Sequence, residues 1–102
     1  MKNTVSSKEF NAVVANRRGL KINGLLFFFK LHPQPKISFI VSKRYGDATK
    51  RNLFKRRCKF LFSEFLGSGF PSIILIVRPL INNLNFKQIR FSFTKLNDQF
   101  RV

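Results

Sequence analysis

The hydrophobic residues of this chain repeat with the period of a helix in some segments and with the period of a strand in others. Between Ser7 and Gly19, apolar residues stand three and four positions apart, and the glycine can cap a helix C-terminus. The apolar residues are Phe10, Val13 and Val14, and Arg17 continues the same spacing. The pattern predicts a short first helix.

Three strands are predicted to follow this helix. The apolar runs 20–22 and 25–31 flank Asn23 and Gly24, a pair that tolerates the positive φ angles of a tight hairpin turn. Two prolines within residues 32–35 then force a loop. Beyond the loop, an alternation typical of a half-buried strand has three apolar members: Ile37, Phe39 and Val41.

From residue 48 to residue 66 the period is helical, and one face of the helix is apolar. That face consists of Phe54, Cys58, Leu61, Phe62 and Phe65. Asp47 or Thr49 can cap the start of this helix, and Gly67 can cap its end. We expect Cys58 to be a small buried hydrophobic residue rather than a reactive thiol or a metal ligand.

The last third of the chain predicts a strand and a helix. Residues 72–77 are uniformly apolar, which favours a buried strand that stops at Arg78 and Pro79. Residues 86–100 fit the helical period, although three of them also alternate as in a strand: Ile89, Phe91 and Phe93. The length of the segment favours a helix. The order α-β-β-β-α-β-α predicts an α+β sandwich formed by a single domain, residues 1–102.

The charge of the chain indicates a polyanionic partner. Lysine and arginine number 20 against four acidic residues, which gives a net charge of +16 and an isoelectric point near 11.5. A membrane surface is the other candidate, but the apolar runs 25–29 and 72–77 are far shorter than the ~20 residues that cross a bilayer. Nucleic acid is therefore the leading partner class, and we expect no membrane partner.

The N-terminus and the cysteine content bear on location. Residues 1–7 lack the apolar run of a signal peptide, so export is not expected. Cys58 is the only cysteine, which excludes an internal disulfide and suits a reducing compartment. We expect a cytoplasmic protein, or a protein of an organelle matrix if an organelle encodes it.

The positive charge is densest between residues 43 and 59. Eight cations stand there beside one acid, Asp47: Lys43, Arg44, Lys50, Arg51, Lys55, Arg56, Arg57 and Lys59. Like charges four apart on a helix cost a few tenths of a kcal/mol per pair, so folding alone does not account for them. A solvated face that keeps the protein soluble is the alternative, but mixed signs would serve solubility as well. Bound phosphates would turn the repulsion into binding free energy through counterion release.

Residues 41–59 read Val41-Ser42-Lys43-Arg44-Tyr45-Gly46-Asp47-Ala48-Thr49-Lys50-Arg51-Asn52-Leu53-Phe54-Lys55-Arg56-Arg57-Cys58-Lys59. This run resembles the signature of the protein subunit of bacterial-type ribonuclease P. Upstream, Glu9 and Phe10 resemble the acidic-Phe pair of the family's first helix. Downstream, residues 73–77 with Arg78 and Pro79 resemble its apolar strand. The resemblance covers nearly the whole chain.

Three positions depart from the family pattern. Leu53 stands where the family's Arg-Asn-Arg motif has its second arginine, and Lys59 replaces a later arginine, which keeps the charge but loses the bidentate fork. Arg57 can compensate only in part, because at about 100° per residue it projects from another side of the helix. Val14 stands where many relatives carry a second aromatic residue.

The resemblance implies that a large RNA is the catalyst, that the basic helix stabilises this RNA, and that a cleft between the first helix and the sheet holds the 5′ leader of precursor tRNA. The residues implied to contact ribonuclease P RNA are Lys43, Arg44, Lys50, Arg51, Asn52, Lys55, Arg56 and Lys59. Those implied to face the leader are Phe10, Val14, Arg17, Arg18 and Lys36. From the residues alone, Phe10 fits the core equally well. A left-handed crossover through the basic helix is also implied, against the usual rule.

The residues of the chain are consistent with catalysis by the RNA. Phosphodiester cleavage by side chains needs paired carboxylates for metal ions or a histidine base. Only four acids and His32 are present, they form no cluster in the sequence, and His32 is expected in an exposed loop. We therefore expect no catalytic residue, metal site or cofactor in the protein, and magnesium only in the RNA–protein complex. No obligate protein partner is expected.

Two other functions stay open at this point. A ribosomal protein or a general RNA chaperone would have the same basic sandwich without serving an enzyme. A membrane-surface protein would have to expose the apolar face of the helix from residue 48 to residue 66, which a sheet can cover instead.

Overall fold

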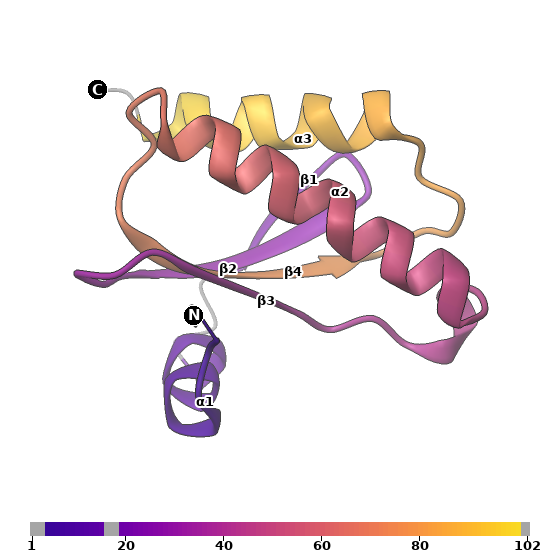
Figure 1. The fold of residues 1–102 in the computed structure, drawn as a ribbon, viewed down its shortest axis with the longest axis horizontal. Coiled ribbons are helices and arrows are strands. Elements are labelled where there is room, and N and C mark those ends of the chain that lie inside the picture. The colour runs from indigo at the N-terminus through magenta and orange to yellow at the C-terminus, as the bar shows by residue number, and fades with distance from the viewer. Residues whose placement is uncertain (1–3, 16–18, 101–102) are drawn as a thin grey trace.

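The structure is a computed structural model that describes residues 4–15 and 19–100 (Figure 1). Its elements along the chain are α1 (Ser7–Ala15), β1 (Leu20–Ile22), β2 (Leu25–Leu31), β3 (Lys36–Phe39), the short 3-10 helix η1 (Lys43–Tyr45), α2 (Ala48–Leu66), β4 (Ile73–Pro79) and α3 (Phe86–Gln99). The predicted α+β class and element order are confirmed, and η1 is an addition.

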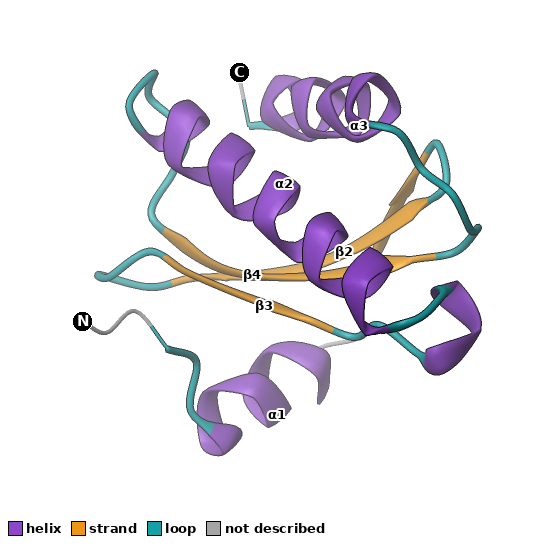
Figure 2. Cartoon of the chain, turned by 45° about the vertical axis from the view of Figure 1, so that its right-hand side comes forward, coloured by secondary structure: helices purple, strands orange, loops and turns teal. Residues whose placement is uncertain are grey.

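The four strands form one sheet in the order β1-β2-β4-β3. β2 pairs antiparallel with β1 and β4, whereas β3 runs parallel to β4. α1 lies on one side of the sheet, and α2 and α3 lie on the other (Figure 2). In Figure 1, β3 lies in front of β4, both strands run to the right, and α2 returns above them. The β3-α2-β4 crossover is therefore left-handed, as the resemblance implied.

Local sequence decides the hairpin turn and the ends of α2. Asn23 and Gly24 have φ angles of 45° and 90°, so the predicted two-residue turn forms. Asp47 caps α2 by accepting a hydrogen bond of 2.9 Å from the Lys50 N–H. Gly67 stands at the C-terminal cap, as predicted.

The ambiguous C-terminal segment is a helix. A capping box starts it, in which the side chains of Asn85 and Gln88 each accept from the other residue's backbone N–H. Ile89 and Phe93 are buried, whereas Phe91 is 48% exposed. A strand would place these three side chains on one face, so the burial pattern excludes the alternating interpretation.

Two strand ends differ from the prediction. β3 ends at Phe39, and all four of its residues are half-buried instead of alternating. The cause is its place at the sheet edge, where neither face is fully covered. β4 continues to Pro79, because Arg78 and Pro79 still pair with Leu26 and Leu25 of β2.

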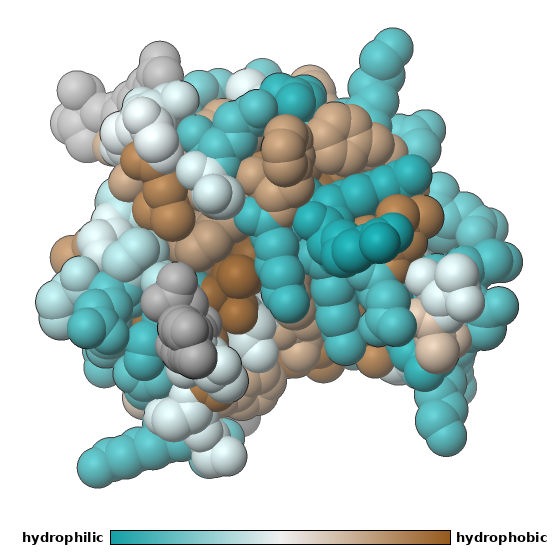
Figure 3. All heavy atoms as spheres, in the orientation of Figure 1, coloured by the Kyte–Doolittle hydropathy of each residue, from teal (hydrophilic) through white to brown (hydrophobic). Residues whose placement is uncertain are grey.

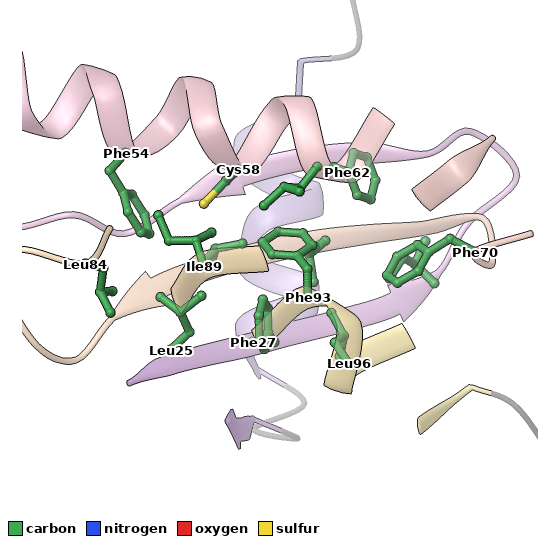
Figure 4. Close-up of a cluster of buried hydrophobic side chains, with 14 of the residues drawn as sticks. Leu25, Phe27, Phe54, Cys58, Phe62, Phe70, Leu84, Ile89, Phe93 and Leu96 are labelled. Atoms are coloured by element: carbon green, nitrogen blue, oxygen red, sulfur yellow. The ribbon is translucent and has the colours of Figure 1, made fainter. Parts of the chain in front are cut away.

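The larger core fills the space between the sheet and the helices α2 and α3. The apolar face of α2 contributes Phe54, Cys58, Leu61 and Phe62, all buried, with Phe65 partly buried beside them. Figure 4 shows Cys58 pointing into this core from α2. The rings of Phe27 from β2 and Phe93 from α3 meet edge to face, with centroids 5.4 Å apart. Because this face is buried, the membrane-surface hypothesis fails.

β4 runs between two apolar layers, which explains its uniform sequence. Ile73, Leu75 and Val77 belong to the larger core. Ile74 and Ile76 face the other side, where they pack with Val13 of α1 in a smaller cluster. The predicted buried strand is thus confirmed, and its two parities serve two different helical layers.

Polar contacts also hold α1 against the sheet edge. Ser6 and Glu9 form a capping box, with the Ser6 N–H donating to Glu9 Oε1 at 3.0 Å. Lys36 Nζ of β3 lies 3.0 Å from the Glu9 carboxylate, and His32 Nε2 lies 3.2 Å from it. His32 is therefore half-buried, and the expectation of an exposed histidine is wrong.

We expect the substitution Glu9→Gln to lower stability in a way that depends on pH. The Ser6 N–H and then Lys36 lower the pKa of Glu9 from 4.5 to about 2. The charge of Glu9 therefore stabilises the fold above pH 4.5, and this contribution is lost as the pH falls toward 2. Thermal unfolding followed by circular dichroism should show a lower midpoint for the variant at pH 7 and converging midpoints at pH 2. An offset independent of pH would contradict this assignment.

A second prediction concerns Cys58. Burial raises the pKa of its thiol, so thiol reagents should label the native protein only as it unfolds. The substitution Cys58→Ser places a hydroxyl in an apolar core and should destabilise the protein by about 1–3 kcal/mol in urea unfolding. Ser63→Ala, an exposed change on the same helix, is the control and should change stability by less than about 0.5 kcal/mol. Equal stabilities would show that Cys58 is poorly packed.

Candidate nucleic-acid interface

The polar side chains of α2 project from three sides of the helix. Lys55 and Lys59 turn toward β3, where they line a groove with residues of that strand. Asn52 and Arg56 point outward. Arg57 turns toward α3, as the rotation of about 100° per residue requires.

The outward side brings together four of the eight residues predicted to contact RNA. A shallow cavity of about 480 Å³ is bordered there by Thr49, Asn52, Leu53, Lys55, Arg56 and Lys59. Asn52, Arg56 and Lys59 are exposed. An arginine fork, an amide and two ammonium groups on one surface match the oxygens of neighbouring phosphates.

Arg51 has a structural contact that sequence reasoning missed. Its Nη1 donates a hydrogen bond of 2.7 Å to the carbonyl oxygen of Gly46. Gly46 has a φ of 153°, and a Cβ at this position would lie 2.8 Å from the side chain of Lys50. Arg51 therefore steadies the loop that carries the exposed residues Lys43 and Arg44, in addition to adding charge.

Arg78 joins the cationic surface through the sheet topology. With Arg44, it borders a cavity of about 300 Å³ that Ser42 and Asn82 also line. The sequence showed Arg78 only as the residue at which a strand stops. The parallel pairing of β3 with β4 places the end of β4 beside the segment that follows β3. No local signal could have shown this neighbourhood.

Leu53 leaves the α3 side of the helix with less charge. It lines a cavity of about 260 Å³ together with Arg57, Asn83 and Asn85, near the start of α3. Arg57 stands one turn after Leu53 on this same side, and hence away from Lys59. Arg57 therefore places a guanidinium on the side of α2 where Leu53 interrupts the series of cations.

The residues expected to face the leader lie in two different surroundings. Phe10 and Val14 are half-buried and pack in the cluster beneath α1. Lys36 pairs with Glu9 and borders the groove of about 630 Å³ between β3 and α2. Arg17 and Arg18 lie outside the described residues.

Metal-binding and membrane-spanning features were sought in the same described part of the chain. Across residues 4–15 and 19–100, no three side chains of histidine, cysteine, aspartate or glutamate are grouped so that they could hold a metal ion. None of the helices in these ranges is long and apolar enough to cross a membrane.

The sequence is similar to several known ribonuclease P protein components. The one from Phytoplasma australiense is 32% identical over 69 residues, and the match covers 66% of this chain and 60% of that protein. The one from Acholeplasma laidlawii is 27% identical over 95 residues, covering 89% of this chain and 82% of the relative. These relatives favour a ribonuclease P protein over the ribosomal-protein and chaperone alternatives.

The fold is similar to those of solved ribonuclease P proteins. The protein from Staphylococcus aureus superimposes with a TM-score of 0.81 at 17% identity, over 100% of this chain and 98% of the other. The protein from Thermotoga maritima gives a TM-score of 0.77 at 17% identity, over 93% and 94%. The sequence model of the Ribonuclease P family matches residues 2–101. With nearly its whole length matched, the chain belongs to the ribonuclease P protein family.

Proposed function

We propose that this protein binds ribonuclease P RNA through the outward side of α2 and so assists the removal of 5′ leaders from precursor tRNA. The observation that supports this most directly is the cationic cavity around Asn52, Arg56 and Lys59, which stands on a helix whose opposite face is fixed in the core. The exposed cations of η1, Lys43 and Arg44, extend the surface. RNA phosphates would relieve the repulsion among these charges.

We further propose that the RNA supplies the catalysis and holds the magnesium ions. Three of the four acids of the protein are engaged in other contacts. Glu9 binds Lys36, Asp47 caps α2, and Glu64 pairs with Arg90 of α3 at 3.2 Å. The protein would therefore contribute binding and positioning, acting in the cytoplasm or an organelle matrix where tRNA is made.

We propose that the leader of precursor tRNA passes along the groove between β3 and α2, whereas the resemblance implied a cleft between the first helix and the sheet. Lys36 stands at one border of this groove, and Lys55 and Lys59 stand at the other. The groove is continuous with the RNA-binding side of α2, because Lys55 and Lys59 border both. Phe10 follows Glu9 in α1, and the Glu9 carboxylate pairs with Lys36 at the groove border.

The affinity for ribonuclease P RNA should depend steeply on salt. If six to eight phosphates are neutralised, log affinity should fall with log salt at a slope of about −4 to −7. Arg56→Ala should reduce the steepness by about 0.9 and leave the thermal midpoint unchanged or slightly raised, because it relieves repulsion. Arg51 is left intact in this test, since its contact with Gly46 supports the fold. A slope shallower than about −2 would refute the phosphate-binding surface.

The protein should restore precursor-tRNA cleavage by a bacterial ribonuclease P RNA at low magnesium concentration. The double variant Arg56→Ala and Lys59→Ala should lose this rescue, and cleavage should occur at the mature 5′ end when rescue succeeds. If the protein binds several bacterial ribonuclease P RNAs but restores cleavage by none of them, the proposed function is contradicted. A general RNA-binding role would then be favoured.

The substitution Lys36→Gln should weaken the preference for leader-bearing precursor tRNA over mature tRNA. It removes a cation from the groove and leaves the Glu9 carboxylate without its lysine partner at the groove border. The ratio of the two dissociation constants, measured with the RNA–protein complex, should fall. Arg56→Ala, which lies outside the groove, should leave this ratio unchanged. An unchanged ratio in Lys36→Gln would place the leader elsewhere.

A further inference from the structure

Two aromatic rings stand on the outer surface where α2 meets α3. The side chain of Phe60 on α2 is 54% exposed. Its ring centroid lies 6.1 Å from that of Phe86 on α3, and the rings are tilted by 49°. Figure 3 shows hydrophobic side chains exposed among hydrophilic ones over these two helices. Phe86 is partly buried against the larger core, whereas the exposed ring of Phe60 belongs to neither core.

A charged pair of side chains lies beside one of these rings, that of Phe86. The guanidinium carbon of Arg90 lies 5.2 Å from the centroid of the Phe86 ring, within the range of a cation–π contact. Arg90 Nη1 also lies 3.2 Å from Glu64 Oε1, so it ties α3 to α2 and offsets the one acid of α2. We call Phe60, Phe86, Glu64 and Arg90 the aromatic patch. Each helix contributes one ring and one charge to it.

The aromatic patch continues the surface proposed to bind RNA. Asn52, Arg56 and Phe60 stand four residues apart on α2 and therefore form one ridge. Phe60 follows Arg56 by about 6 Å along the helix axis. The ridge turns toward α3 by about 40° at each step, which brings Phe60 to Phe86. A strand of RNA whose phosphates meet Arg56 would thus place its next bases near an exposed ring.

We propose that Phe60, backed by Phe86 and Arg90, stacks against an unpaired nucleobase of ribonuclease P RNA. The proposal rests on the proposed function, because it extends the same RNA-binding surface. Charge favours RNA over a protein occupant. Arg56 and Arg57 stand four and three residues before Phe60, Lys87 follows Phe86, and the net charge of the chain is +16. Every base has a π face, so such a platform binds without demanding a particular sequence.

The substitution Phe60→Ala should weaken binding of a transcribed bacterial ribonuclease P RNA by about 5- to 150-fold, the effect of one stacked base. The salt slope should stay unchanged, because phenylalanine neutralises no phosphate. Phe60→Trp should retain or improve the affinity, whereas Phe60→Leu should behave like Phe60→Ala, since leucine is apolar but cannot stack. Filter binding over a range of salt concentrations measures both quantities.

Phe91→Ala is the matched control. Phe91 is 48% exposed and so resembles Phe60 in exposure, and Lys95 Nζ lies 5.4 Å from its ring centroid, much as Arg90 lies over the ring of Phe86. It follows Phe86 by five residues and therefore points about 140° away around α3. Its removal should leave RNA affinity unchanged. A loss equal to that of Phe60→Ala would indicate general hydrophobic adhesion and overturn the proposal.

Other outcomes separate this proposal from the proposed function. If Arg56→Ala weakens binding while Phe60→Ala and Phe60→Leu bind like the wild type, the stacking proposal fails alone. If the wild type itself binds ribonuclease P RNA weakly and with a shallow salt slope, the proposed function fails with it. If sedimentation shows that Phe60→Ala changes only self-association, the aromatic patch is a protein contact and the proposal is overturned.

Discussion

The packing of α2 across the sheet is the constraint on which the rest of this structure depends. Phe54, Cys58, Leu61 and Phe62 are buried together, and this fixes the rotation of the helix about its axis. This rotation fixes the direction in which each of the six cationic side chains of α2 projects. Several of them therefore lie close together on the exposed sides of the helix. Hydrophobic burial thereby holds like charges close together against their repulsion. The result is a preformed cationic surface that a polyanion can bind without first ordering the helix.

The sheet has an apolar layer on each of its two faces. β4 contributes one parity of side chains to the larger core and the other to the cluster beneath α1, so the two layers share one strand. The left-handed β3-α2-β4 crossover sets α2 above the sheet edge, where Lys55, Lys59 and β3 enclose a groove. The contact of Glu9 with Lys36 and His32 fixes α1 beside the same edge. The groove and α1 are therefore both positioned by the same edge of the sheet.

The position of Leu53 in the structure shows what surrounds this departure from the family pattern. Leu53 lies on the α3 side of α2, where Arg57 still supplies a guanidinium. Farther along α2, Phe60 meets the ring of Phe86, over which the guanidinium of Arg90 lies. The side of α2 that faces α3 therefore carries Lys50, Arg57 and an exposed ring, whereas the side that faces β3 carries Lys55 and Lys59. The exposed ring near α3 suits contact with a base, and the lysines near β3 suit contact with phosphates.

The sequence by itself determined the elements, because their signals are local. The Asn23-Gly24 turn, the Asp47 cap and the apolar spacing of α2 depend on neighbours a few residues away, and the family signature in residues 41–59 is one continuous run. Tertiary structure alone decided what meets across the chain. It placed Arg78 beside Arg44, tied Lys36 and His32 to Glu9, and joined Phe60 to Phe86. These contacts depend on strand order and on the rotation of packed helices, which are set by the burial of all the apolar faces at once and by no single segment.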